Sequence, residues 1–229
     1  HLRGLTIRAG GYHDRLPVLM NRVMSTLADP VISEQRFRIA RQQLMDSLRN
    51  RLQDKPVAQA ASLAQDTLIQ GAWTTEGKLA AAEARTVDDL RAFAETFTEE
   101  VDAVMLVHGN ATRAFALNTA GQARATLLHN SQAATVNRSQ VRDLPEGQTG
   151  IRLQVPHPDT GYLRYSQGKD TSFAERARYR LLTQVISGAF YEELRTKRQL
   201  GYIVYATPFE MLEPPAIGRG VHAPEARAA

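Results

Sequence analysis

The stretch Tyr191-Glu-Glu-Leu-Arg-Thr-Lys-Arg-Gln-Leu-Gly-Tyr-Ile-Val-Tyr205 lies where the hydrophobic period of the sequence changes. The residues from Tyr202 to Thr207 are mostly β-branched or aromatic, which predicts a buried strand. Before the stretch, apolar residues recur at helical spacing, which predicts an amphipathic helix with its end covered on several sides. The two apolar rows of this helix are Phe173, Ala177, Leu181, Val185 and Ala189, and beside them Leu182, Ile186, Phe190 and Leu194. Gly188, among them, is expected to permit close packing.

Two side chains at this junction of helix, basic turn and strand have the chemistry of a binding site. Arg195 carries a permanently charged, planar fork of donors, and Tyr202 carries a neutral hydroxyl donor. Together they can hold a carbonyl oxygen or a developing oxyanion. The spacing alone favours a plainer interpretation, in which Arg195 forms a surface ion pair and Tyr202 packs in the core.

The identity of the residues in this stretch favours the binding-site interpretation over the plainer one. Leu194-Arg-Thr-Lys-Arg-Gln-Leu-Gly-Tyr-Ile-Val204, preceded by Ile186-Ser-Gly-Ala-Phe-Tyr191, closely resembles a signature in the C-terminal half of the pitrilysin/insulinase family of zinc metallopeptidases. In that family, an arginine and a tyrosine at these places reach from the non-catalytic half across an enclosed chamber to the peptide at the zinc site. The resemblance therefore implies that Arg195 and Tyr202 bind substrate. It also implies two partners, a peptide and a zinc-bearing N-terminal half in the same chain or in a separate subunit.

The composition of the chain narrows the classes of protein to which it can belong. The chain has 229 residues, 43% of them hydrophobic, and no cysteine, so neither disulfides nor thiolate metal ligands can form. The compartment of this bacterial-type soluble protein is thus open between cytoplasm and periplasm. No apolar run approaches the roughly 18 residues that span a bilayer, so no membrane partner is expected. The net charge of +4 comes from scattered basic residues without a recognisable nucleic-acid motif, which disfavours nucleic-acid binding.

Periodicity and capping signals predict an α+β fold of two similar layered units, each a mainly antiparallel sheet with helices packed on one face. The first unit covers residues 1–129, a polar linker follows at 130–150, and a partial second unit occupies 151–229. Strands are expected at residues 5–11, 103–109, 151–155 and 162–167 in addition to 202–207, and helices at 16–27, 33–54, 57–69, 75–84, 86–97, 112–129 and 172–195.

The C-terminal tail, residues 212–229, is rich in Pro, Gly, Ala and Arg and shows neither period, so we expect it to be irregular. We therefore expect the second unit to be truncated and to lack part of its sheet. The strand edge left exposed would favour pairing with another chain, including a second copy of this one.

Catalytic chemistry is not expected within this chain. The family's inverted zinc motif, H-x-x-E-H, places two histidines and a glutamate on one helix, and no such motif occurs. The six histidines are far apart in sequence and are expected to be structural or exposed: His1, His13, His108, His129, His157 and His222. We therefore expect no metal ligands and no cofactor here, zinc in the partner half, and a segment that is inactive alone. The alternative is a catalytically inert structural or assembly relative with the same fold.

Overall fold

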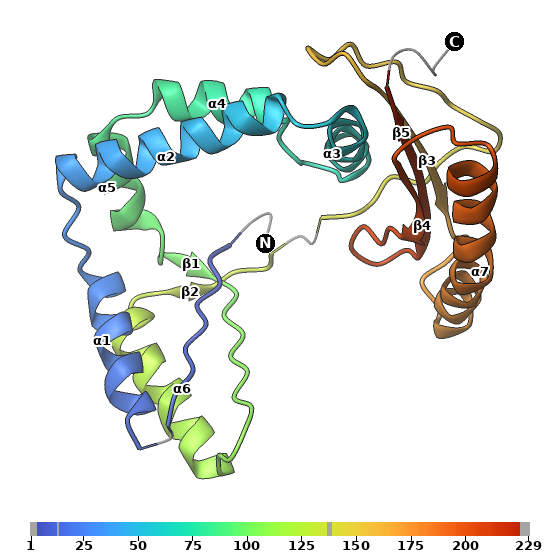
Figure 1. The fold of residues 1–229 in the computed structure, drawn as a ribbon. Coiled ribbons are helices and arrows are strands. Elements are labelled where there is room, and N and C mark those ends of the chain that lie inside the picture. Colours follow the sequence, from blue (N-terminus) through green and yellow to red (C-terminus); the bar gives the residue numbers. More distant parts are fainter. Residues whose placement is uncertain (1–3, 13, 137–138, 225–229) are drawn as a thin grey trace. The chain divides into compact units, whose positions relative to one another are not determined.

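The computed structural model describes residues 4–12, 14–136 and 139–224, and the chain forms two compact units (Figure 1). The first comprises His1–Gln43 and Glu83–Arg138, and the second comprises Leu44–Ala82 and Ser139–Ala229. The chain returns to the second unit at Ser139, and residues 44–82, predicted in the first unit, group with the second.

The first unit is mostly helical. It contains α1 (Leu16–Ala28), α5 (Val87–Thr96) and α6 (Arg113–Leu127), and α1 packs against α6. Thr86 caps α5 in a reciprocal box with Asp89, because each side chain accepts a hydrogen bond from the other residue's backbone N–H. Its only described strand pairing is a two-residue parallel ladder between β1 (Glu100–Val101) and β2 (Gln132–Ala133).

Two expected strands of this unit do not form. Residues 5–11 and 103–109 have no strand assignment, and the side chains of Val104 and Leu106 are 90% and 87% exposed. An extended segment becomes a strand only when a neighbour pairs with its backbone N–H and C=O groups. Neither segment finds such a neighbour among the residues described.

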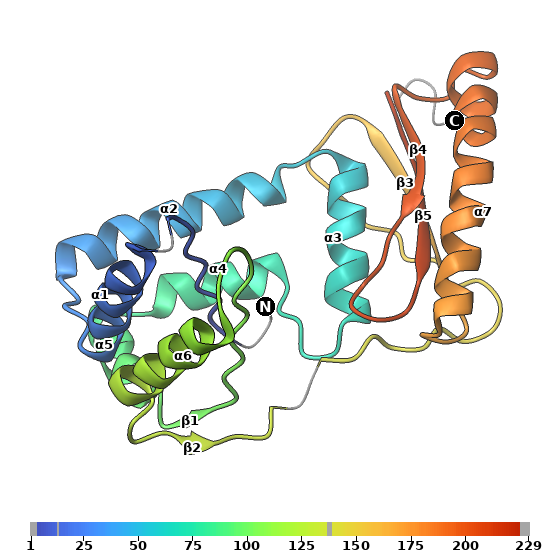
Figure 2. The ribbon, with the colours of Figure 1, turned by 90° about the horizontal axis from the view of Figure 1, so that it is seen from below.

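The second unit is built on an antiparallel sheet of three strands in the order β3-β5-β4. The strands are β3 (Thr160–Gln167), β4 (Ile203–Pro208) and β5 (Ala216–Ala223). Helix α7 (Phe173–Tyr191) packs mainly against β4, and α3 (Pro56–Leu68) packs mainly against β3, on the opposite face of the sheet (Figures 1 and 2). The α+β class and the antiparallel sheet are confirmed. The placement of helices on one face alone is not, because α3 covers the second face. Residues 151–155, expected to be a strand, are not one.

Two further helices carry residues of both units, α2 (Glu34–Leu52) and α4 (Thr75–Ala84). Within the described residues, no helix combines the length and the apolar character needed to cross a bilayer.

The expectation of an irregular tail is wrong for residues 216–223, which form β5, the central strand of the sheet. Strand β5 lacks the alternating apolar pattern that predicts a strand, because two of its buried positions are glycines. A Cβ at Gly220 would overlap the ring of Tyr205, and one at Gly218 would lie 3.0 Å from the ring of Phe209. The glycines leave space for these aromatic rings. The rings therefore fill the volume that side chains of β5 would otherwise occupy.

Helix α7 differs from expectation in the face that it buries. Its buried residues are Glu175 and Thr183, whereas Phe173, the first residue of the longer apolar row, is 91% exposed. A Cβ at Gly188 would meet nothing within 4 Å, so this glycine does not serve close packing in the described structure. The start of the helix is as predicted, because Ser172 accepts a hydrogen bond from the Glu175 backbone N–H at 3.2 Å.

Candidate functional site

The end of α7 changes its winding before it reaches the basic turn. Residues Glu192–Lys197 form a π-helix, η1, in which backbone hydrogen bonds reach five residues back, and the Arg198 N–H donates to the Glu193 carbonyl at 3.0 Å. Single turns of this kind inside α-helices occur frequently at functional sites. Arg195 lies within this turn.

Arg195 differs from its basic neighbours, Lys197 and Arg198, in having no partner among the described residues. Lys197 bonds to the carboxylates of Glu192 and Glu193, and Arg198 donates to Glu193 at 2.8 Å. The half-buried Arg195 makes neither an ion pair nor a side-chain hydrogen bond with any residue that the structure describes. Its guanidinium group therefore keeps all its donors available, and the surface ion pair of the plainer interpretation is not formed.

Tyr202 lies immediately before β4 and is tied to β5 through its backbone. Its N–H donates to the His222 carbonyl at 3.0 Å. Gly201 precedes it and is buried so close to the His222 carbonyl that a Cβ would overlap the oxygen. The backbone is thereby fixed, while the Tyr202 side chain remains 42% exposed. Tyr202 is therefore not packed in the core.

The Tyr202 hydroxyl belongs to a hydrogen-bonded triangle with Asp159 and His222. It donates to Asp159 Oδ2 at 2.8 Å and lies 3.2 Å from His222 Nε2, and the third side, from His222 Nε2 to Asp159 Oδ2, is 3.1 Å. Asp159 comes just before β3 and His222 lies on β5, so three segments distant in sequence supply the group. We name these three residues the Tyr202 triangle.

The triangle alters the acidity of two of its members. The hydrogen bond from Tyr202 holds the pKa of the Asp159 carboxyl below its usual range, because it stabilises the ionised form. The same bond raises the pKa of the Tyr202 hydroxyl, since losing the proton would place two negative groups together. The arrangement therefore favours an ionised aspartate beside a protonated tyrosine.

The structure brings together two histidines that sequence spacing had separated. His157, Asp159 and His222 each offer one potential ligand atom, and these atoms lie within 4.8 Å of one another. The donors are of a kind that zinc accepts. They do not fit the H-x-x-E-H site, however, because His157 comes from a loop and His222 from a strand, not from one helix. Hydrogen bonds to Asp159 already account for their convergence. His1 and His13 lie outside the described residues.

Sequence reasoning placed Arg195 and Tyr202 in a site but missed Asp159 and His222. The only local signal was His157-Pro-Asp159, which was interpreted as a turn. The turn is present, because the Asp159 N–H donates to His157 Nδ1 at 3.0 Å, but the Asp159 carboxylate points to Tyr202 instead. Nothing near His222 in the sequence indicated its partners.

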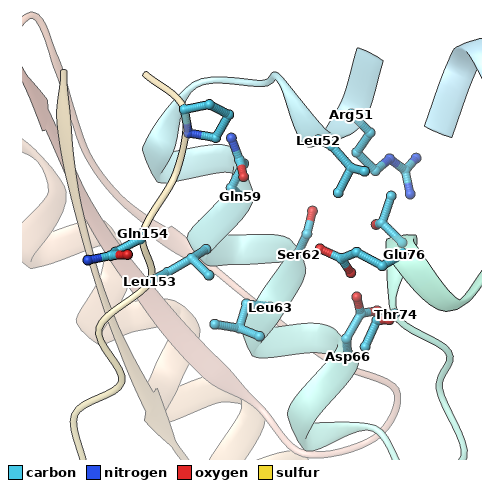
Figure 3. Close-up of a pocket in the computed structure, with 12 residues that line it drawn as sticks. Arg51, Leu52, Gln59, Ser62, Leu63, Asp66, Thr74, Glu76, Leu153 and Gln154 are labelled. Atoms are coloured by element: carbon cyan, nitrogen blue, oxygen red, sulfur yellow. The ribbon is translucent and has the colours of Figure 1, made fainter. Parts of the chain in front are cut away.

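A separate cavity of about 280 Å³ lies in the second unit and does not include the Tyr202 triangle (Figure 3). It is formed by the end of α2, one side of α3, the start of α4 and residues 153–156. Its polar lining includes Arg51, Ser62, Asp66 and Glu76. Burial raises the pKa of the Asp66 carboxyl, and the nearby positive charge of Lys78 opposes that change.

Comparison with known proteins bears on the whole chain. Residues 1–81 match a family model described as the middle or third domain of peptidase M16. Residues 181–229, which include Arg195 and Tyr202, match a model described as the C-terminal lobe domain 4 of PQQ synthase PqqF-like proteins. Together these matches support a C-terminal part of an M16 metallopeptidase.

Individual M16 relatives agree with these matches. The human insulin-degrading enzyme is 29% identical over 212 residues, covering 90% of this chain and 21% of the relative. The A-factor-processing enzyme of Saccharomyces cerevisiae is 26% identical over 212 residues, covering 90% of this chain and 20% of the relative. The chain therefore spans about a fifth of the length of these curated relatives.

A solved structure supports the fold. The crystal structure of pitrilysin superposes with a TM-score of 0.79 at 18% identity, covering 93% of this chain and 23% of that one. At this identity the likeness shows the fold alone. The M16 family inferred from the residues around Arg195 and the α+β fold are both confirmed.

Proposed function

We propose that this chain belongs to the non-catalytic, substrate-binding C-terminal half of a zinc metalloendopeptidase that cleaves peptides in an enclosed chamber. The observation that carries the proposal is the half-buried guanidinium of Arg195, which has no partner within the described part of the chain and lies in the segment that matches the fourth-domain model. Leaving a charged group half-buried without a partner costs stability, so such a group fits a role in which a ligand supplies the partner.

Arg195 and Tyr202 suit the recognition of a peptide backbone. The guanidinium of Arg195 donates two parallel hydrogen bonds to carbonyl oxygens and retains its charge throughout the cleavage. The exposed hydroxyl of Tyr202 offers a neutral polar contact on a backbone held by β5. Interactions of this kind accelerate a reaction when they strengthen as negative charge develops on the carbonyl oxygen. Zinc in the partner half would supply the activated water.

Two classes of substrate fit a member of this family, small peptides for general degradation and a peptide precursor of pyrroloquinoline quinone. The match of residues 181–229 to a model named for PQQ synthase favours the precursor. Both classes present backbone carbonyls to Arg195, so the choice between them depends on other contacts.

The test is steady-state peptide cleavage by the full-length protein carrying Arg195→Ala or Tyr202→Phe. Each change should lower kcat by about 10- to 100-fold, the factor expected for one hydrogen bond to a charged or developing charged group. Arg152→Ala and Tyr162→Phe, at exposed positions, should leave kcat unchanged. Mixing this chain with a zinc-bearing half should restore cleavage that neither part performs alone.

The rival function is that of an inert structural or assembly relative, for which Arg195 and Tyr202 are dispensable. Unchanged cleavage in the Arg195→Ala/Tyr202→Phe double variant would favour it. Zinc-dependent proteolysis by the isolated chain would contradict both functions.

A further inference from the structure

The Tyr202 triangle is buried at His222 and exposed to solvent at Tyr202. His222 is fully buried, with 0% of its surface exposed, whereas the Tyr202 side chain reaches solvent. The half-buried carboxylate of Asp159 joins them. A ligand can therefore approach Tyr202 but cannot reach His222, and any influence of His222 on that ligand must pass through its two partners.

Hydrogen-bond accounting fixes the direction of each bond. The ionised Asp159 carboxylate only accepts, so the Tyr202 hydroxyl and the Nε2–H of His222 both donate to it. Nε2 of His222 therefore carries a proton, and its Nδ1 is buried without a hydrogen-bond partner among the described residues.

The surroundings hold this arrangement in place. The Asp159 backbone N–H donates to His157, whose ring meets that of His222 edge-on with centroids 5.8 Å apart. On the other side, the ammonium group of Lys55 lies 5.4 Å from the centre of the Tyr202 ring. Strand β5 fixes the Tyr202 backbone, and the triangle fixes its hydroxyl.

We propose that Asp159 and His222 are positioning residues that set the place of the Tyr202 hydroxyl and act on peptide cleavage through it. This inference rests on the proposed role of Tyr202 in peptide binding. In the free protein, the hydroxyl proton points to Asp159. When the hydroxyl proton turns to a peptide carbonyl, the Nε2–H of His222, 3.2 Å away, can donate to the hydroxyl oxygen and keep it in place. Asp159 remains hydrogen-bonded to the same Nε2–H and keeps the ring of His222 oriented, so the charge-assisted bond of Asp159 persists in the bound state.

A double-mutant cycle in the full-length protein tests the proposal. Asp159→Asn should lower kcat about tenfold, the factor of one charge-assisted hydrogen bond, and should change KM less. In the Tyr202→Phe background, the same substitution should have no further effect, because the hydroxyl through which Asp159 acts is absent. Asp143→Asn, at an exposed position, is the matched control.

A second pair of variants separates positioning from folding. His222→Gln retains an N–H donor and should keep most of the activity, whereas His222→Leu retains the bulk without the donor and should lose as much as Asp159→Asn. An NMR titration of the Tyr202 ring gives a readout without substrate, since its pKa should fall in Asp159→Asn.

The outcomes distinguish this inference from the proposed function. No effect of Tyr202→Phe on kcat would overturn both. A loss in Tyr202→Phe together with an unchanged Asp159→Asn, or with losses that multiply in the double variant, would overturn the inference and leave the proposed function standing.

Discussion

Replacing Gly201 by alanine should destabilise the second unit. The Cβ would overlap the His222 carbonyl oxygen and lie 2.9 Å from its carbon and 3.2 Å from Val221 Cγ1. The first two are backbone atoms of the central strand, so they cannot rotate away as a side chain would. The junction must separate from β5 instead.

The magnitude follows from two losses. Overpacking a well-packed site costs about 1–3 kcal/mol. Separation also breaks or lengthens the hydrogen bond from the Tyr202 N–H to the His222 carbonyl, which costs about 0.5–1.5 kcal/mol more. The expected destabilisation is therefore about 2–4 kcal/mol.

Gly188→Ala is the matched control, because its Cβ would meet nothing within 4 Å and it lies in a helix. Alanine should stabilise α7 there by about 1 kcal/mol. Urea unfolding followed by circular dichroism should give a lower midpoint for Gly201→Ala and a higher one for Gly188→Ala. Equal midpoints for Gly201→Ala and the unsubstituted protein would refute the reasoning.

Two further predictions concern the hydroxyls of Tyr165 and Tyr179 and the dependence of stability on pH. Burial raises the pKa of Tyr165 to about 12, and its hydroxyl has no partner among the described residues, so Tyr165→Phe should stabilise the protein by about 1 kcal/mol in urea unfolding. Tyr179→Phe should instead destabilise the protein, since the Tyr179 hydroxyl donates to the Gln167 carbonyl at 2.8 Å. Equal changes in the urea midpoint of the two variants would contradict this account. The folded-state pKa of Asp159 lies below its ordinary value of 3.8, so its contribution to stability is present above that pH and is lost as pH falls through the folded value. The difference in urea midpoint between the unsubstituted protein and Asp159→Asn should therefore shrink as pH is lowered to 3, and a constant difference would argue against the bond.

Features encoded by neighbouring residues could be predicted from the sequence. Helix starts at Thr86 and Ser172 follow from a hydroxyl placed three residues before a backbone N–H that it can accept from. The change from helix to strand between Arg195 and Tyr202 was likewise visible in one short segment. Such signals need no knowledge of the rest of the fold.

Features that depend on partners distant in the sequence could not be predicted from it. Strand β5 was missed because Gly218 and Gly220 conceal its pattern until the rings of Tyr205 and Phe209 are placed over them. The Tyr202 triangle joins residues separated by 43 and 63 positions, and no local spacing encodes such contacts. The face of α7 was misjudged because apolar side chains lie on several sides of it, so the period alone did not select the packed one.

The π-helix η1 has a consequence for comparing related sequences at this site. An α-helix turns by about 100° per residue, so one additional residue in a turn rotates everything after it by that angle. A helical wheel continued from α7 therefore assigns the residues of η1 to the wrong side. Relatives that differ by a single residue between Glu192 and Lys197 would present a different side chain where this protein presents Arg195, even if the letters align on either side.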